Sequence, residues 1–431
     1  MRLSVLSRRG AVSAVLLVIS VLCGPAVGAG ADAGRVIDVP RVKSALPAQP
    51  CVNAACAVLM DPQTGVVLYE RNAHLHRPMA STTKIMTAIL LIENCGMNDI
   101  VTASKNASET QFTSIHLKPG EKITVRDLLY GMMIRSANDA AVAAAEHIAG
   151  STAKFAAMMN KKAKEIGCRD THFVTPNGLY AKGHYSSAYD LCLMARYASK
   201  YEIFNEVVNT RRYTLSSRTK NKEDMIVFCR SRFMRDYYGA DGIKSGYIKQ
   251  AGYCYVGSAT RNGWRLISAV LRSDNAGRDT AAMMDYAFAG FIPVEVAKKD
   301  DVCGRLEVRG GAQDNIALTP IRDFRVIVPK TGGKIVTKIE AEPVEAPIVR
   351  GTKMGVMTAY VNGRDAGSVE LRAAQNMEIS ATRKFLRFAG MSGLILACLV
   401  VGGKCGAAIA ENSRRRRRRF TTSLRGIDRY R

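Results

Sequence analysis

The spacing of apolar residues changes along this chain from strand-like to helical and back to strand-like. This order is the feature that most restricts the fold. Residues 55–69 alternate around a turn at residues 61–65, which predicts two strands. Helical spacing follows, and the expected helices are 82–93, 125–134, 140–148, 152–166 and 187–199. Strands are expected again at 242–247, 253–259 and 265–271, and a final helix at 280–288. Strands on both sides of a helical middle predict an α/β domain over residues 51–293, whose sheet uses both ends of this stretch.

Beyond residue 293, short alternating strands are separated by turns that contain Gly, Pro and Asn. The expected strands are 305–308, 323–328, 335–339, 357–361 and 367–371. Such strands predict a small all-β sandwich, which we place at residues 294–378.

The first 31 residues have the pattern of a secretory signal peptide. Arg2, Arg8 and Arg9 form a basic start, residues 11–23 are apolar, and small residues follow. We therefore expect an exported protein in which residues 32–50 form an unstructured linker.

The C-terminal residues 379–431 have the pattern of a membrane anchor with a basic tail. Residues 388–410 are apolar apart from Lys404, and residues 414–419 are all arginine. About 20 apolar residues can span a bilayer, and a neighbouring basic cluster stays in the cytoplasm. We therefore expect the catalytic domain on the extracytoplasmic face, with membrane lipid as a partner. An interfacial helix, or a basic tail that binds anionic lipid or nucleic acid, is the alternative.

The formal net charge of +25 raises the question of a nucleic-acid partner. From Arg383 onward the chain has 13 lysines and arginines and two acids, so +11 belongs to the tail. A nucleic-acid-binding protein would need a basic domain with a recognisable reader motif. We find none and expect no nucleic-acid partner.

A Ser-x-x-Lys pattern can place a nucleophilic hydroxyl one helical turn from an amine base. It occurs as Ser81 with Lys84, Ser151 with Lys154, and Ser217 with Lys220. Ser151 follows a glycine and fits a helix N-cap, whereas Ser217 lies in a polar, basic loop. Ser81 begins a helix that is apolar nearly all round, so Lys84 should be buried and must have a polar partner or a task.

A Ser-x-Asn pattern supplies a hydroxyl and an amide, and Ser136 with Asn138 lies between two expected helices. Two competing copies begin at residues 104 and 273. The second is a literal Ser-Asp-Asn between a strand and a helix, where capping is the better interpretation.

Lys244, Ser245 and Gly246 lie on an expected strand with a hairpin partner. The lysine and the serine could hold a carboxylate, and the glycine lets a ligand approach the backbone closely. A literal Lys-Thr-Gly at 330–332 follows a proline and precedes a glycine, which indicates a turn.

With these patterns in this order, the chain resembles the D-alanyl-D-alanine carboxypeptidases, the low-molecular-mass penicillin-binding proteins of the serine peptidase type. The matching stretches are YERNAHLHRPMASTTKIMTAILLIE (69–93), FVTPNGL and GHYSSAYDL (within 173–191), and DGIKSGYIKQAGYCYVGSATRNGWRLISAVL (241–271). The resemblance covers about residues 52–293, and the β-rich segment and the anchor are also usual in that family. It implies the penicillin-binding and β-lactamase-like transpeptidase fold, an antiparallel sheet with helices and a helical subdomain. A β-sandwich and a C-terminal membrane helix would follow.

The resemblance implies an enzyme that removes the terminal D-alanine from peptidoglycan pentapeptide stems and is acylated by β-lactams. Ser81 would attack the D-Ala-D-Ala bond with Lys84 as its base, and Ser136 would relay a proton to the leaving D-alanine. The backbone N–H groups of Ser81 and Tyr247 would form the oxyanion hole.

The resemblance also implies the substrate contacts. Asn138 would hold the substrate backbone. Lys244 and Ser245, next to Gly246, would bind the terminal carboxylate, assisted by Arg265 on the neighbouring strand.

Two positions depart from the family pattern. Ser245 replaces a threonine and keeps its hydroxyl, whereas Ile248 stands where the family commonly has a threonine, and so removes a polar group from the cleft edge. A D,D-endopeptidase or a β-lactamase could use the same site, and a non-catalytic wall-binding protein is the third alternative. The extra β-domain and the lack of an obvious deacylating Glu in 173–191 weaken the β-lactamase alternative, and intact Ser81 and Lys84 argue against a non-catalytic protein.

No metal or cofactor is expected. His74 and His76 could suggest a metal pair, but the sequence places no carboxylate ligand near them, so a solvated loop is the better interpretation. A glycine-rich phosphate loop is also lacking.

Overall fold

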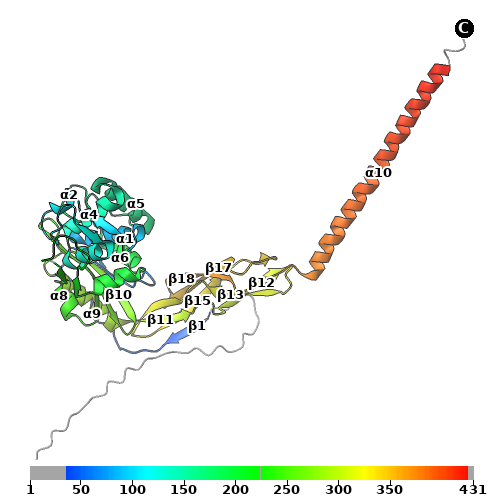
Figure 1. The fold of residues 1–431 in the computed structure, drawn as a ribbon. Helices are drawn as coiled ribbons and strands as arrows, with labels where there is room; N and C mark the ends of the chain where they lie inside the picture. Colours follow the sequence, from blue (N-terminus) through cyan, green and yellow to red (C-terminus); the bar gives the residue numbers. More distant parts are fainter. Residues whose placement is uncertain (1–34, 224, 426–431) are drawn as a thin grey trace, which may run out of the picture.

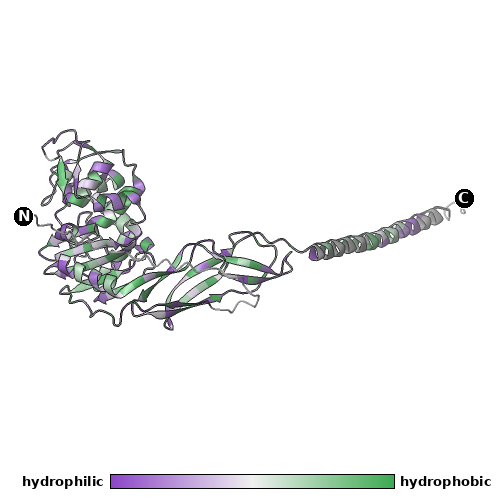
Figure 2. Cartoon of the chain, turned by 90° about the horizontal axis from the view of Figure 1, so that it is seen from below, coloured by the Kyte–Doolittle hydropathy of each residue, from purple (hydrophilic) through white to green (hydrophobic). Residues whose placement is uncertain are grey.

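The computed structural model describes residues 35–223 and 225–425. They form an α/β domain, an elongated β-domain and a long C-terminal helix that extends away from both (Figure 1). Figure 2 shows apolar and polar residues interleaved along the strands of both folded domains, as expected for sheets that each bury a face.

A five-stranded antiparallel sheet, ordered β3-β2-β10-β9-β8, forms the centre of the first domain. Its strands are β2 (Cys56–Met60), β3 (Val67–Arg71), β8 (Ala240–Ile248), β9 (Gly252–Arg261) and β10 (Trp264–Ser273). The sheet therefore uses both ends of the domain sequence, as predicted, and β8 is an edge strand.

Both faces of this sheet are buried, because successive residues of a strand point to opposite faces. In β2, Cys56, Val58 and Met60 belong to the core on the helical side, whereas Ala57 and Leu59 belong to the core on the other side. Helix α6 (Ala188–Ala198) lies against β2 and β10 on the first face, and α9 (Ala276–Gly290) lies against β9 and β10 on the second.

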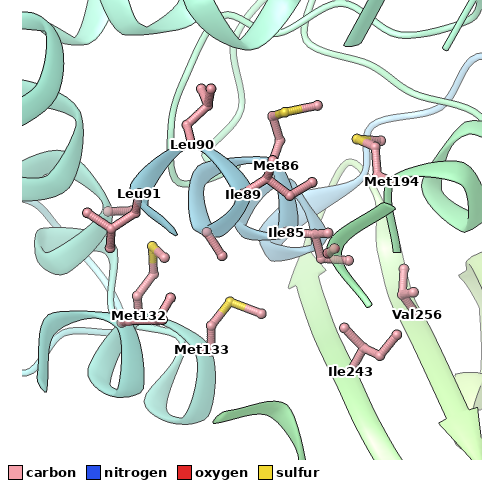
Figure 3. Close-up of a cluster of buried hydrophobic side chains, with 14 of the residues drawn as sticks. Ile85, Met86, Ile89, Leu90, Leu91, Met132, Met133, Met194, Ile243 and Val256 are labelled. Carbon is pink, nitrogen blue, oxygen red and sulfur yellow. The ribbon is translucent and has the colours of Figure 1, made fainter. Parts of the chain in front are cut away.

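The short 3-10 helix η1 (Ala80–Thr83) leads directly into α1 (Lys84–Asn94), whose residues 84–91 are all buried. Figure 3 shows Ile85, Met86 and Ile89 of α1 surrounded by residues of other elements. These include Met132 and Met133 of the π-helix η2 (Gly131–Arg135), Met194 of α6, and Ile243 and Val256 of the sheet. The prediction that this helix is buried nearly all round is confirmed.

The remaining helices of the first domain pack against α1, against another helix or against the sheet. They are α2 (Lys105–Ser108), α3 (Val125–Tyr130), α4 (Asn138–Ala149), α5 (Thr152–Ile166), α7 (Glu202–Asn209) and α8 (Arg232–Asp236). Two small hairpins pair β4 (Ile100–Thr102) with β5 (Lys122–Thr124) and β6 (Arg212–Thr214) with β7 (Ile226–Phe228). Short elements such as α7, α8 and the hairpins were not predicted from the sequence.

The second domain pairs a seven-stranded sheet, ordered β1-β15-β17-β18-β13-β12-β16, with a two-stranded sheet of β11 and β14. The strands are β11 (Phe291–Ala297), β12 (Gly304–Arg309), β13 (Asn315–Pro320), β14 (Phe324–Pro329), β15 (Gly333–Glu340), β16 (Val344–Glu345), β17 (Lys353–Val361) and β18 (Arg364–Ala373). All five strands expected in this region are present, and their apolar residues form one core.

The expectation that residues 32–50 are an unstructured linker is wrong for β1 (Val36–Val39). This segment pairs antiparallel with β15, where Val39 lies opposite Gly333, and Val39 is buried in the core of the second domain. The alternating VIDV sequence suits an edge strand with one buried face. The N-terminal segment is therefore part of the β-domain.

The long helix α10 (Ala381–Arg425) begins where the β-domain ends. Among the residues searched, which are those the structure describes, no helix is long and apolar enough to cross a bilayer. The side chains of 386–394, 396 and 397, most of which belong to the expected anchor at 388–410, lie outside the described part of the chain. The anchor at 388–410 stays a prediction, and the expected signal peptide also lies outside the described residues.

Candidate active site

Ser81 lies in η1 and Lys84 begins α1, so one helical turn separates them. The Lys84 Nζ lies 2.9 Å from the Oγ of Ser81, within hydrogen-bond distance. It donates to Oδ1 of Asn138 and to the backbone carbonyl of Asn177, both at 2.7 Å. The side chain of Lys84 is fully buried. The expected buried lysine therefore exists, and three oxygens surround its amine.

The electrostatics of the site favour a neutral Lys84 amine. Burial holds the pKa of Lys84 well below its ordinary value, and the positive charge of Lys244 lowers the pKa further, whereas the Asp139 carboxylate opposes the shift. Burial also lowers the pKa of Lys244, to about 8. A lysine whose pKa is depressed in this way can accept a proton near neutral pH.

Asn138 begins α4, and its position is fixed from two directions. Its backbone N–H donates to the carbonyl of Thr113 at 2.7 Å, and its Nδ2 donates to the carbonyl of Gln111 at 3.0 Å. These bonds turn Oδ1 toward Lys84. Ser136 ends η2 with a left-handed φ of 67°, and this reversal places it, half-buried, two residues before Asn138. Among the described contacts, Asn138 reaches Lys84, whereas none joins Ser136 to Ser81 or to Lys84.

Strand β8 packs directly on the turn that contains Ser81. A Cβ added to Gly246 would lie 2.8 Å from the backbone nitrogen of Ser81 and 3.0 Å from the Cβ of Ala80. Only a glycine permits this approach. Lys244 is buried and its Nζ donates to the carbonyl of Ser245 at 3.0 Å, whereas the Ser245 side chain is exposed.

The residues after Gly246 continue the alternation of β8. Tyr247 is 58% exposed, on the same face as Ser245, and its ring centroid lies 4.6 Å from that of Tyr253. Ile248 is on the face of Lys244 and packs against the hydrophobic core of the helical side. The loss of a polar residue at position 248 therefore changes a half-buried packing position.

Arg265 is placed differently from the expectation. Its guanidinium donates to Oδ1 of Asn205 at 2.7 Å and to Oγ of Ser258 at 3.0 Å, and it lies 3.5 Å from the Asp241 carboxylate. Asp241 is at the beginning of β8, away from Ser245. Neither Lys244 nor Ser245 is among the described contacts of Arg265. The structure therefore does not place Arg265 beside the expected carboxylate-binding pair.

Sequence reasoning included residues 173–191 in the resemblance but missed the contact that the Asn177 backbone carbonyl makes with Lys84. A backbone carbonyl that holds a lysine leaves no side-chain signature, and the only local signal is the Pro-Asn-Gly turn. Gly178 has a φ of +85°, and a Cβ there would lie within 2 Å of the carbonyl oxygen of Ala80. This loop therefore closes against the nucleophile turn.

The competing motifs have structural roles, and the capping predicted for Ser151 and for the turn at 273–275 is confirmed. Ser151, Ser104 and Asn275 are N-caps of α5, α2 and α9, and each accepts a backbone N–H. Ser217 bonds to Asp127 and Lys330 follows β14 in a turn of the other domain.

The statement that no carboxylate lies near His74 and His76 is wrong, because Asp170 contacts both rings, at 2.8 and 3.2 Å. Both histidine side chains are more than half exposed. Among the described residues, no group of three or more His, Cys, Asp and Glu could hold a metal ion.

Comparison with known families covers both domains. The family described as D-alanyl-D-alanine carboxypeptidase matches residues 43–275, and the C-terminal domain of penicillin-binding protein 5 matches residues 291–378. The chain belongs to the D-alanyl-D-alanine carboxypeptidase family. The D-alanyl-D-alanine carboxypeptidase DacF of Bacillus subtilis is 34% identical over 347 residues, 78% of this chain and 88% of that protein. DacD of Salmonella typhimurium is 31% identical over 73% of this chain and 84% of that protein.

Solved structures of carboxypeptidases and related enzymes support the same family assignment. Penicillin-binding protein 5 of Haemophilus influenzae has a TM-score of 0.68 at 26% identity and covers 77% of this chain and 99% of its own. The Streptomyces K15 DD-transpeptidase has a TM-score of 0.52 at 33% identity over 56% of this chain and all of its own. The protein is thus a serine-type D-Ala-D-Ala carboxypeptidase with the penicillin-binding fold and a C-terminal β-domain. Peptidoglycan stem peptides as substrates and β-lactams as ligands are consistent with this family.

Proposed function

We propose that this carboxypeptidase uses Ser81 as its nucleophile and Lys84 as its general base. The neutral amine of Lys84, 2.9 Å from Ser81 Oγ, takes the hydroxyl proton while the oxygen attacks the carbonyl carbon of the penultimate D-alanine. The Asn138 amide oxygen and the Asn177 carbonyl then stabilise the ammonium that forms. The result is an acyl-enzyme on Ser81 and, after hydrolysis by water, a shortened stem peptide.

The other residues around Ser81 and Lys84 have the remaining roles in this proposal. The backbone N–H groups of Ser81 and Tyr247 bind the developing oxyanion, which is usually the largest single contribution in acyl transfer. Ser136 passes a proton to the leaving D-alanine. Lys244 and Ser245 bind the terminal carboxylate through charge-assisted hydrogen bonds.

Asn138 and Arg265 complete the substrate contacts that we propose. Asn138 holds the substrate backbone through its side-chain amide, whose Nδ2 donates to the carbonyl of Gln111 in the free enzyme. Arg265 assists carboxylate binding indirectly, because its bonds to Ser258 and to Asp241 hold the beginning of β8 in register. The support for this indirect role is that Asp241 also accepts from Ser258 and from Thr260.

We further propose that the enzyme is exported by its N-terminal signal and held at the membrane by residues 388–410, with the catalytic domain outside the cytoplasm. The basic start of the chain and the arginines at 414–419 support this orientation. Its natural substrate is then the pentapeptide stem of peptidoglycan.

The observation that carries the mechanism is the buried Lys84 amine between Ser81, Asn138 and Asn177. The test is release of D-alanine from a D-Ala-D-Ala pentapeptide by the wild type, Ser81→Ala and Ser151→Ala. Ser81→Ala should release none, whereas Ser151→Ala should match the wild type because Ser151 is an N-cap. Activity that survives in Ser81→Ala would overturn the assignment.

A second function is favoured by the likeness to the Streptomyces K15 DD-transpeptidase. The same acyl-enzyme could pass its acyl group to an amine, or could form from a cross-linked stem as in a D,D-endopeptidase. Incubation with a pentapeptide, a D-amino acid acceptor and a cross-linked dimer, followed by mass spectrometry of the products, separates the three reactions. Hydrolysis of the pentapeptide should dominate.

A further inference from the structure

His184 is a buried histidine that the mechanism above does not use. It is 5% exposed, and its ring lies edge-on to Phe173 with centroids 5.9 Å apart. Each of its ring nitrogens contacts a different part of the active-site framework. The ring therefore connects two segments that are far apart in the sequence.

The first contact fixes the tautomer of His184. Nδ1 faces the backbone N–H of Val174 at 2.9 Å and that of Thr175 at 3.4 Å. A backbone N–H can only donate, so Nδ1 is the acceptor and the neutral ring carries its proton on Nε2. This part of the ring anchors the beginning of the loop that carries Asn177.

The second contact reaches the nucleophile turn. Nε2 lies 2.9 Å from Oγ1 of Thr83, so the imidazole N–H donates to the hydroxyl. The hydroxyl in turn donates to the carbonyl of Ala80 at 2.8 Å. Ala80 immediately precedes Ser81 and has a φ of +49°, a left-handed conformation that is unfavourable for alanine. A chain of hydrogen bonds thus supports a strained residue beside the nucleophile.

The loop on the other side of the ring makes three contacts with η1 and the beginning of α1. The carbonyl of Asn177 accepts from Lys84, and the carbonyl of Pro176 accepts from Oγ1 of Thr87 at 2.5 Å. Gly178 approaches Ala80 so closely that a Cβ there could not be accommodated. Any shift of this loop therefore moves the carbonyl that holds the Lys84 amine.

The ring is kept neutral by its surroundings. Burial, followed by the charge of the nearby His172, lowers the pKa of His184 to about 4. At neutral pH, Nδ1 therefore remains an acceptor and Nε2 a donor, which both contacts require.

We propose that His184 is a positioning residue for acylation. By joining the loop at 174–177 to Thr83, it holds Ser81 Oγ and the Asn177 carbonyl in the arrangement in which both reach Lys84. This inference deepens the proposed function and rests on the roles given there to Ser81 and Lys84.

Two substitutions separate the two contacts of the ring. In His184→Asn, the amide oxygen replaces Nδ1 and can still accept from Val174, but the contact with Thr83 is lost. In His184→Gln, the longer amide can still donate to Thr83. Thr83→Val removes the hydroxyl and keeps the shape of the side chain, so it tests the same connection if a histidine variant does not fold. His172→Asn, at an exposed position that borders this loop, is the matched control, because an asparagine amide can still donate to the carbonyl of Gly183.

The measurement is the second-order rate constant of acylation by a fluorescent penicillin from pH 5 to 10, with thermal unfolding of each variant. His184→Asn and Thr83→Val should each be acylated about 10- to 100-fold more slowly than the wild type, because small misplacements of reacting groups lower the rate by about this factor. The double variant should be acylated no more slowly than either single variant, because both substitutions break the same connection. The acid limb of the profile should move to higher pH, since a less enclosed Lys84 amine keeps its proton more readily. His184→Gln should retain more activity than His184→Asn, and His172→Asn should match the wild type.

The outcomes distinguish this inference from the proposed function. If the wild type is not acylated on Ser81, the proposed function fails. If the wild type is acylated, but His184→Asn and Thr83→Val have wild-type rates and an unmoved acid limb, only the role of His184 is wrong. A lower unfolding temperature with an unchanged profile would also overturn it, because that result describes a purely structural histidine.

Discussion

Gly246 and Ser81 are in backbone contact, since a Cβ on residue 246 would lie 2.8 Å from the backbone nitrogen of Ser81. That nitrogen carries one of the two proposed oxyanion-hole donors. Gly246→Ala must displace either β8 or η1, and loss of one such donor typically costs about 10²- to 10³-fold in rate. We expect a comparable fall in the acylation rate with a fluorescent penicillin. Gly277→Ala is the control, because the nearest atom to its added Cβ lies at 3.6 Å, an ordinary contact. A wild-type rate of acylation of Gly246→Ala would contradict this close packing of β8 on η1.

The charge of Lys244 should be visible in the pH dependence of acylation. Acylation needs a neutral Lys84, so the rate rises with pH through the pKa of Lys84, which burial and the Lys244 charge both lower. Lys244→Met removes that charge, so the pKa of Lys84 should rise and the acid limb should move to higher pH. The position of the limb is independent of the lower rate that weaker carboxylate binding causes. An unmoved limb in a stopped-flow pH profile would show that the two lysines are not coupled.

Lys244 should also produce an alkaline limb for peptide substrates. Its pKa is lowered to about 8, and only the protonated form attracts the substrate carboxylate. The value of kcat/KM for a pentapeptide should therefore fall above about pH 8, because kcat/KM reports the ionisation of the free enzyme. Lys244→Arg stays protonated throughout this range, so its profile should lack the alkaline limb. An alkaline limb that persists in Lys244→Arg belongs to another group.

The strand β1 should stabilise the β-domain without affecting catalysis. Val39 is buried in the second core, whereas Val36 on the same strand is 48% exposed. Val39→Asp buries an unpaired carboxylate and should cost about 3 kcal/mol in the stability of this domain. Val36→Asp should change it by about 0.5 kcal/mol or less. Calorimetry measures the transition, and penicillin acylation should be normal in both. Equal effects of the two substitutions would mean that β1 does not pack as described.

The sequence predicted the framework of the site well where chemistry resides in side chains. Lys84 is buried one turn from Ser81, as the apolar helix predicted, whereas the contact of Lys84 with Asn138 was not predicted. Gly246 was also placed correctly, on a strand that faces the nucleophile.

The features that were missed depend on backbone groups or on long-range pairing. The carbonyl of Asn177 has no side-chain signature, and β1 pairs with a strand about 300 residues away in the chain. The family resemblance implied that Arg265 assists carboxylate binding, whereas its described partners are Asn205, Ser258 and Asp241. Its actual partners depend on the bulge near the beginning of β8, which spacing alone does not reveal.

The central claim is that Ser81 is the residue that becomes acylated. Mass spectrometry of the penicillin-treated, proteolysed protein tests it most directly. The penicilloyl adduct should be found on the peptide that contains Ser81, and it should be absent from Ser81→Ala. An adduct on the peptide of Ser151 or Ser217, or labelling that survives in Ser81→Ala, would contradict the account.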